Sequence, residues 1–207
     1  MACFHDAPSV PAGIVNSVNE HGTEVGTVLS SHPEIDVISF TGSSRTGKII
    51  MANASDTIKH VSLELGGKAP ALVFDDADLE KSVAEIRRGV LALNGQMCTC
   101  ISRILVQDSV YDSVRQRLKE AFTSVKIGDA SAAGTELGPI IDRANQQRLA
   151  GIIERAADQA QMVIHGGVGE GELAKGCFIT PSMFEIDDVG LSLIHISEPT
   201  RRSDISY

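Results

Sequence analysis

The chain has no tryptophan, and its two tyrosines and six phenylalanines bring the aromatic content of its 207 residues to only 4%. An interior must therefore be built mostly from Val, Ile, Leu and Ala. Enough of these are present, because hydrophobic residues make up 43% and charged residues 22% of the chain. That balance is typical of a soluble globular protein and argues against disorder. The length allows one domain of ordinary size or two small ones.

Basic residues are in the minority, with 18 Lys and Arg against 27 Asp and Glu and a formal net charge of −9. A nucleic-acid partner would need a basic face that neutralises phosphates. Nothing in this charge balance suggests such a face, so we expect no nucleic-acid partner.

A long apolar run and a secretion signal are also missing. No run approaches the roughly 18 residues that cross a bilayer, and residues 1–13 have neither a basic n-region nor an apolar h-region. We therefore expect no membrane partner and a cytoplasmic location. In that reducing compartment the cysteines are expected to be thiols rather than a disulfide framework. They are Cys3, Cys98, Cys100 and Cys177.

Short apolar runs alternate with longer segments of helical periodicity. The runs predict strands at residues 14–18, 37–40, 61–65, 71–74, 104–106, 162–164 and 178–180, the second of them buried. Apolar residues three and four positions apart predict helices at residues 23–31, 46–54, 110–122 and 142–160, and one that begins near Asp78. The alternation favours an α/β fold in which helices cover a parallel or mixed sheet.

Two stretches interrupt this pattern and one ends it. The pair Gly66-Gly67 separates two strand-like runs and is the best candidate for a domain boundary. Residues 166–171 are predicted to be a Gly-rich loop. Residues 190–207 have no helical or strand period, and their stretch SLIHISEPTR resembles the peptide made when a sequencing adapter is translated by mistake. We expect this segment to be a non-native tail, the alternative being an ordinary polar C-terminus.

Glu64 is the first candidate for chemistry. It lies in LELGGK, a carboxylate in an apolar strand that runs into two glycines. A carboxylate withdrawn from water holds its proton more readily, which suits a general base near neutral pH. Alternation leaves a second interpretation open, because Leu63 and Leu65 can both face the core while Glu64 faces water.

Cys98 is the second candidate and lies in NGQMCTC, after the helix that begins near Asp78. A thiolate is a strong nucleophile whose reactivity depends on its ionisation and its accessibility. The alternatives are a buried structural thiol and a metal site shared with Cys100. The metal site is disfavoured, because no second Cys or His pair stands at zinc-ligand spacing.

A third feature is the segment ISFTGSSRTG, residues 38–47, in which a strand runs into Gly42 and a helix opens by Gly47. Glycine lets a backbone approach a ligand closely, and the N–H groups at a helix N-terminus attract phosphate. The segment is neither GxGxxG nor a Walker loop, so alone it is weak evidence for a nucleotide.

Taken together, four segments resemble signatures of the aldehyde dehydrogenase superfamily and follow the family's order. They are PAGIVN (residues 11–16), ISFTGSSRTG (38–47), LELGGKAP (63–70) and NGQMCTCISR (94–103). LGP at 137–139 and TP at 180–181 match weaker signatures. The 34 positions from Glu64 to Cys98 also fit the family's base-to-nucleophile separation. The resemblance covers residues 8–188.

The resemblance implies that this is an oxidoreductase that converts a small-molecule aldehyde to a carboxylic acid. Cys98, the Cys after Gly-Gln-X, would attack the aldehyde to form a thiohemiacetal and then a thioester. Glu64 would be the general base that activates water for hydrolysis of the thioester. Cys100 has no role in the resemblance, and a Cys98–Cys100 disulfide under oxidation is a further hypothesis.

A cofactor site and a domain organisation are implied as well. The cofactor would be NAD or NADP, and no metal is implied. The residues that match positions near the cofactor are Gly42, Ser43, Gly47, Leu65 and Gly66. Residues 1–66 would be the C-terminal part of a Rossmann-like NAD(P)-binding domain, and residues 67–189 a truncated catalytic domain that carries the thiol.

Family members are longer than this chain, and a full-length parent is expected to be a homo-oligomer. Three other readings stay open: an inactive truncated fragment, a semialdehyde dehydrogenase that transfers the acyl group to CoA, and a nucleotide-binding module without catalysis. Glu64 favours hydrolysis over CoA acylation, because a carboxylate base activates water.

Overall fold

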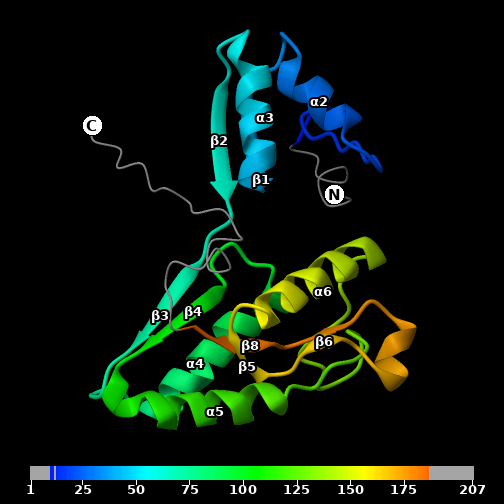
Figure 1. Cartoon of the computed structure of the whole chain (residues 1–207). Coiled ribbons are helices and arrows are strands. Elements are labelled where there is room, and N and C mark those ends of the chain that lie inside the picture. Colours follow the sequence, from blue (N-terminus) through cyan, green and yellow to red (C-terminus); the bar gives the residue numbers. More distant parts are fainter. Residues whose placement is uncertain (1–9, 12, 187–207) are drawn as a thin grey trace. The chain divides into compact units, whose positions relative to one another are not determined.

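The computed structural model describes residues 10, 11 and 13–186, and the chain divides between Leu65 and Gly66 into two units (Figure 1). The first unit contains α2 (Glu24–Ser31), β1 (Val37–Gly42), α3 (Ser44–Ser55) and β2 (His60–Leu65). The second begins with β3 (Ala69–Val73), α4 (Leu79–Leu91), the 3-10 helix η1 (Ala92–Gly95), β4 (Ile101–Val106), the 3-10 helix η2 (Asp108–Val110) and α5 (Tyr111–Thr123). It continues with α6 (Arg143–Ala157), β5 (Gln161–Ile164), β6 (Gly167–Val168), the 3-10 helix η3 (Gly171–Lys175), β7 (Ile179–Thr180) and β8 (Met183–Glu185).

This alternation of strands and helices confirms the α/β fold class. The expected non-native tail and Cys3 lie outside the described residues.

In the first unit β1 and β2 are parallel neighbours, and α3 is the helix that connects them. Two parallel strands need such a crossover, because a tight turn can join only antiparallel ones. Ser43 begins α3, since its side-chain oxygen accepts a hydrogen bond from the Thr46 N–H at 3.2 Å. The helix packs closely on β2 at Gly47, where a Cβ would lie 3.2 Å from a methyl of Leu65 and 3.3 Å from one of Leu63.

Two predictions for the first unit are wrong. Residues 14–18 form bends and coil instead of a strand, and Ile14 and Val18 are 66% and 67% exposed. A strand requires a partner for its backbone, and β1 and β2 of this unit pair only with each other in the described part of the chain. The strand predicted at 37–40 is present but is not buried, since Val37 is 63% exposed.

The second unit repeats the strand–helix–strand arrangement. Its strands β3 and β4 are parallel and are connected through α4, against which α5 packs (Figure 1). Asp78 begins α4 by accepting a hydrogen bond from the Lys81 N–H at 3.1 Å. The predicted apolar stripes of α4 and α5 are confirmed, because their residues form the core with one residue of β3. That core consists of Val73, Val83, Ile86, Val114, Leu118 and Phe122.

The rest of the second unit is built from antiparallel strand pairs beside α6. β5 pairs with β8 and β6 pairs with β7. The prediction of a loop at 166–171 is therefore partly wrong, because Gly167–Val168 is a strand. Gly166 has a packing reason, since a Cβ there would lie 2.1 Å from the Pro181 carbonyl oxygen. Buried Gln146 joins α6 to this region by donating a hydrogen bond to the Phe178 carbonyl at 2.8 Å.

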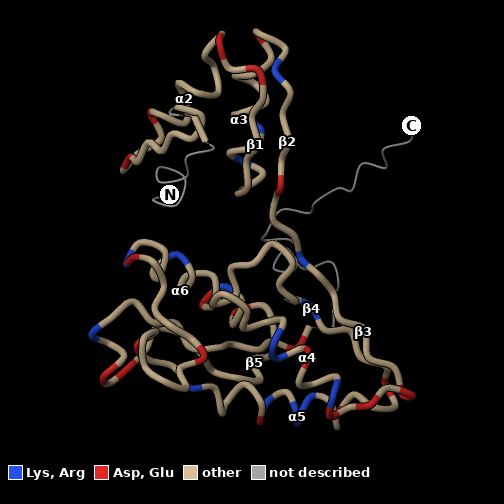
Figure 2. Tube along the Cα trace, turned by 180° about the vertical axis from the view of Figure 1, so that it is seen from behind, with Lys and Arg blue, Asp and Glu red and all other residues tan. Residues whose placement is uncertain are grey.

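Charged residues of both signs are distributed along the described chain (Figure 2). α5 shows this most clearly, because it carries Arg115, Arg117 and Lys119 together with Asp112 and Glu120. None of the helices among the described residues combines the length and the apolar character that a membrane crossing requires.

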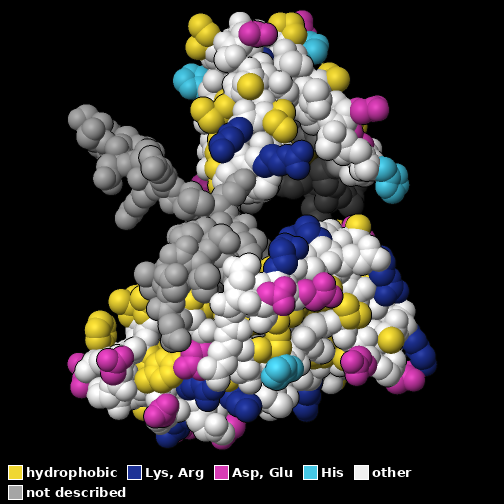
Figure 3. Space-filling model, in the orientation of Figure 1, with side chains coloured by type: hydrophobic (Ala, Val, Ile, Leu, Met, Phe, Trp, Pro, Cys, Tyr) yellow, Lys and Arg dark blue, Asp and Glu magenta, His cyan; other side chains and the backbone are white. Residues whose placement is uncertain are grey.

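One face of the β3–β4 pair is covered by α4, and the other is apolar and exposed. Leu72 and Leu105 are register partners across the two strands and are 61% and 52% exposed. Phe74, which follows β3, is 56% exposed. Figure 3 shows hydrophobic side chains on the surface over these strands. Parallel strands are usually buried on both faces, so this pair lacks a cover within the described residues.

Candidate active site

Cys98 lies in the turn between η1 and β4. Its thiol is free and exposed, whereas Cys100, two residues later, is buried. The Cys100 sulfur donates a weak hydrogen bond to the Ala92 carbonyl oxygen at 3.4 Å. The two interpretations, a buried structural thiol and an accessible nucleophile, thus apply to different cysteines of this motif. Cys100 is the buried structural thiol, and Cys98 is the accessible one.

The turn that carries Cys98 has an unusual backbone. Leu93, Asn94 and Gly95 follow one another with φ of 48°, 56° and 72°, in the left-handed region. A left-handed backbone costs a residue such as Leu93 about 1–2 kcal/mol, and Leu93 regains little by burial because it is 72% exposed. Strained residues of this kind cluster at functional sites, where the surrounding structure holds them.

Asn94 supplies the longest-range contacts of this turn. Its side-chain oxygen accepts a hydrogen bond from the Gly138 N–H at 3.1 Å, and its amide nitrogen donates one to the Pro139 carbonyl at 3.3 Å. The weak LGP signature at 137–139 therefore lies against the Cys98 turn. No motif in the sequence assigned a role to Asn94, although an Asn before a Gly is a known signal for a left-handed backbone.

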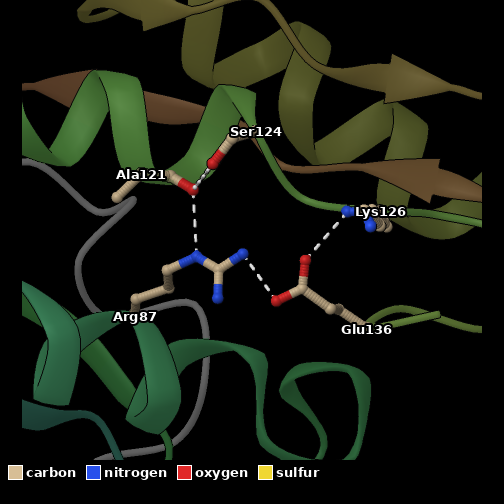
Figure 4. Close-up of polar contacts among 5 residues, drawn as sticks. All are labelled: Arg87, Ala121, Ser124, Lys126 and Glu136. Carbon is tan, nitrogen blue, oxygen red and sulfur yellow. Dashed lines mark hydrogen bonds and ion pairs between the residues drawn. The ribbon is translucent and has the colours of Figure 1, made fainter. Parts of the chain in front are cut away.

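Glu136, the residue before the LGP segment, has contacts of its own (Figure 4). Glu136 forms an ion pair with Arg87 of α4 at 2.6 Å and accepts a hydrogen bond from the Lys126 N–H at 3.0 Å. Arg87 also donates a hydrogen bond to the Ala121 carbonyl at 3.0 Å. The Lys126 N–H and the Arg87 side chain stabilise the charged form of Glu136, which lowers the pKa of that carboxyl.

Glu64 lies in β2 of the first unit and is exposed. Leu63 and Leu65 point toward α3, where they meet the position of Gly47, so the carboxylate of Glu64 lies on the opposite face of the strand. Thr41 is its partner across β1. The first unit by itself therefore does not withdraw Glu64 from water. Its cooperation with Cys98, which belongs to the second unit, stays a prediction.

The predicted cofactor residues differ in their surroundings. Gly42 and Ser43 are exposed at the N-terminus of α3, whose first turn has no acidic residue. Such a helix end fits a phosphate group. Gly47 is buried, and the packing of α3 on β2 explains its small size. Leu65 and Gly66 are half-buried, and a Cβ on Gly66 would meet no atom within 4 Å.

Lys68 and Arg103 form a further contact beside these motifs. The Arg103 guanidinium donates two hydrogen bonds to the Lys68 carbonyl oxygen, at 3.2 and 2.7 Å. The pKa of the Lys68 amine lies below its usual range, first because burial disfavours the charge and second because Arg103 repels it.

The described residues contain no group of three or more His, Cys, Asp or Glu that could hold a metal ion.

Comparison with known proteins places these motifs in a family. The family model described as "Aldehyde dehydrogenase family" matches residues 1–189. A chloroplastic aminoaldehyde dehydrogenase of Arabidopsis thaliana is 38% identical over 184 residues, which are 89% of this chain and 36% of that protein.

Solved structures agree with the sequence comparison. Betaine aldehyde dehydrogenase from Staphylococcus aureus in complex with NAD+ matches with a TM-score of 0.81 at 37% identity, over 86% of this chain and 35% of that one. An aldehyde dehydrogenase from Bartonella henselae matches with a TM-score of 0.76 at 34% identity, over 81% of this chain and 35% of that one. The chain spans little more than a third of the length of these relatives. With a family match over most of its residues, it belongs to the aldehyde dehydrogenase family.

Proposed function

We propose that this chain carries the nucleophile and the general base of an NAD- or NADP-dependent enzyme that oxidises a small aldehyde to a carboxylic acid. One observation carries the proposal. Cys98 is an exposed free thiol next to a left-handed turn, whereas its neighbour Cys100 is buried. A nucleophile must be reachable by a carbonyl group, and of these two cysteines only Cys98 meets that condition.

In the proposed reaction the Cys98 sulfur, as thiolate, adds to the aldehyde carbon and forms a thiohemiacetal. The Cys98 N–H donates a hydrogen bond to the oxyanion that develops on the substrate. Bound NAD or NADP supplies the acceptor for the hydride that leaves this carbon. A thioester on Cys98 remains.

Glu64 then takes a proton from water, and the water oxygen attacks the thioester carbon. The carbon–sulfur bond breaks, the carboxylic acid leaves, the Cys98 thiolate is restored, and Glu64 releases its proton to solvent. Because the base activates water, hydrolysis is favoured over transfer to CoA.

The cofactor assignment is supported by local geometry. Gly42 and Ser43 are exposed immediately before α3, whose N-terminus attracts a phosphate through the helix dipole. Buried Gly47 contributes by letting α3 pack closely on β2. Leu65 and Gly66 are proposed to pass near the nicotinamide. NAD is the cofactor in the Staphylococcus aureus structure.

The same proposal covers organisation and setting. Residues 1–66 are assigned to the NAD(P)-binding domain and residues 67–189 to the domain that carries the thiol. The substrate is a small aldehyde, and the similar proteins are an aminoaldehyde dehydrogenase and a betaine aldehyde dehydrogenase. We further assign the enzyme to the cytoplasm and expect its full-length form to be a homo-oligomer without nucleic-acid or membrane partners.

Thiol labelling tests the central assignment directly on this chain. Brief exposure to iodoacetamide should label Cys98 before Cys100 and Cys177, because only Cys98 is exposed among them. In the full-length enzyme Cys98→Ala should abolish aldehyde oxidation, whereas the matched Cys177→Ala should retain it. Activity that survives Cys98→Ala would remove Cys98 from the mechanism.

A further inference from the structure

We propose that Asn94 is a positioning residue that fastens the Cys98 turn to the Gly138–Pro139 segment and so sets the reactivity of the Cys98 thiol. The inference rests on the proposed function, because it assigns Asn94 to the support of that nucleophile. It concerns contacts within the second unit alone.

Both ends of the Asn94 amide are used, and they reach 44 and 45 residues along the chain. The oxygen accepts from the Gly138 N–H, and the nitrogen donates to the carbonyl of the next residue, Pro139. Two bonds to consecutive residues fix the orientation of the amide plane, which one bond does not. The Asn94 backbone, four residues before Cys98, is thereby tied to a distant segment.

The residue type fits both tasks. Asn is among the few non-glycine residues that enter the left-handed region readily, and Asn94 has φ 56° and ψ 37°. Glycine at this position would keep the backbone conformation but would lose both side-chain bonds. The neighbouring Leu93, also left-handed, has no such advantage and is largely exposed. The side-chain bonds of Asn94 therefore help to hold a conformation that is unfavourable in isolation.

The segment that receives Asn94 is a firm support. Glu136, two residues before Gly138, is held by Arg87 and the Lys126 N–H (Figure 4). Leu137 is buried and forms a bridge with Ile127. Immediately after Pro139, Ile140 donates a backbone hydrogen bond to the Cys177 carbonyl at 2.6 Å. A positioning contact transmits rigidity only if its far end is fixed, and this end is fixed on both sides.

Three variants separate the side-chain bonds from the backbone effect. Asn94→Gly removes both bonds and tolerates the left-handed turn, whereas Asn94→Asp keeps only the acceptor for Gly138. Asn53→Ala is the matched control, because it removes one long-range Asn hydrogen bond, to Ser30 at 2.8 Å, in the first unit.

The readout is the iodoacetamide rate at Cys98, compared with that of a peptide of residues 93–100 in which Cys100 is replaced by Ser. In the parental chain the rate at Cys98 should differ from the peptide rate by at least about threefold, because the held turn determines how a reagent approaches the thiol. Asn94→Gly should move to the peptide rate, Asn94→Asp should lie between the two, and Asn53→Ala should keep the parental rate.

The labelling of Cys100 and Cys177 in the same samples reports unfolding. If both become as reactive as free thiols in Asn94→Gly, the comparison is made with Asn94→Asp. The inference is overturned if the parental rate equals the peptide rate, or if the folded Asn94 variant keeps the parental rate. Failure of the proposed function is a separate result, namely aldehyde oxidation that persists in full-length Cys98→Ala.

Discussion

The Arg103 guanidinium donates two hydrogen bonds to the backbone carbonyl of Lys68, at 3.2 and 2.7 Å. Lys68 lies four residues after Glu64, and Arg103 lies five residues after Cys98. The contact therefore joins the two segments that lead away from the proposed base and the proposed nucleophile. The register of β3 against β4 shifts at the same place, between Ala69 and Pro70. The two hydrogen bonds from the Arg103 side chain anchor the start of β3 at this irregularity.

Arg103→Met should loosen this anchor. The free energy of unfolding should fall by about 1–3 kcal/mol, because the Lys68 carbonyl loses its charged donors. The pKa of the Lys68 amine should rise partway toward its usual range, since the repulsion disappears while burial remains. Chemical denaturation measures the first effect, and the pH dependence of Lys68 labelling by an amine reagent measures the second. Arg148→Met on α6 is the control, and an unchanged Lys68 profile in Arg103→Met would contradict the prediction.

Glu64→Gln in the full-length enzyme should separate the two halves of the reaction. The first turnover should release reduced cofactor at a near-normal rate, because formation of the thioester on Cys98 does not require Glu64. Later turnovers should slow by about 100-fold or more, because water lacks its base. Stopped-flow absorbance should therefore show a burst followed by arrest. Glu34→Gln, at an exposed site of the same unit, should behave as wild type, and a normal steady rate in Glu64→Gln would exclude Glu64 as the base.

Glu136 should contribute an acid-sensitive term to stability. Its pKa in the folded chain is lowered by the Lys126 N–H and by Arg87, so the stabilisation is present above the unfolded pKa. It is lost as the pH falls through the lower folded pKa. Thermal unfolding between about pH 5 and pH 2 should show this decline. Glu136→Gln should have a shallower decline, and identical slopes in the two proteins would remove Glu136 from the acid response.

Lys59 should be important for the stability of the first unit. Its side chain is 9% exposed, and its ammonium donates hydrogen bonds to the carbonyls of His32 and Ile35. Lys59→Met keeps an unbranched side chain that is only one atom shorter but leaves those carbonyls without this donor, at a cost of about 1–3 kcal/mol. Denaturation should show the loss, and Lys48→Met at an exposed position of α3 is the comparison. Equal stability of the two variants would show that the Lys59 contacts contribute nothing.

The sequence predicted those elements best whose stability is local. α4 was predictable from residues that are neighbours in the chain. Asp78 stands at the helix start, and helical spacing connects the apolar residues Leu79, Val83, Ile86 and Val90. Residues 14–18 also have an apolar run, but a strand depends on a partner that the run does not encode. The exposure of Val37 was missed for the same reason, because burial depends on what covers the strand.

The candidate site was predictable in its chemistry and less so in its surroundings. The motif identified Cys98, yet spacing could not show that Cys98 is exposed while Cys100 is buried. The Asn94 contacts with Gly138 and Pro139 join residues 44 and 45 positions apart. Hydrophobic periodicity carries no information about contacts between residues so far apart in sequence. Only the weak LGP signature pointed to the segment that contains Gly138 and Pro139.

The leucine pair of the β3–β4 sheet, Leu72 and Leu105, has a practical consequence. Exposed apolar side chains on this sheet can pack against those of a second molecule as readily as against a covering segment of the same chain. A concentrated solution of this polypeptide should become turbid on warming and bind a fluorescent apolar dye. Leu72→Lys should reduce the turbidity, because the lysine charges of two copies repel each other and the face that α4 covers is unchanged.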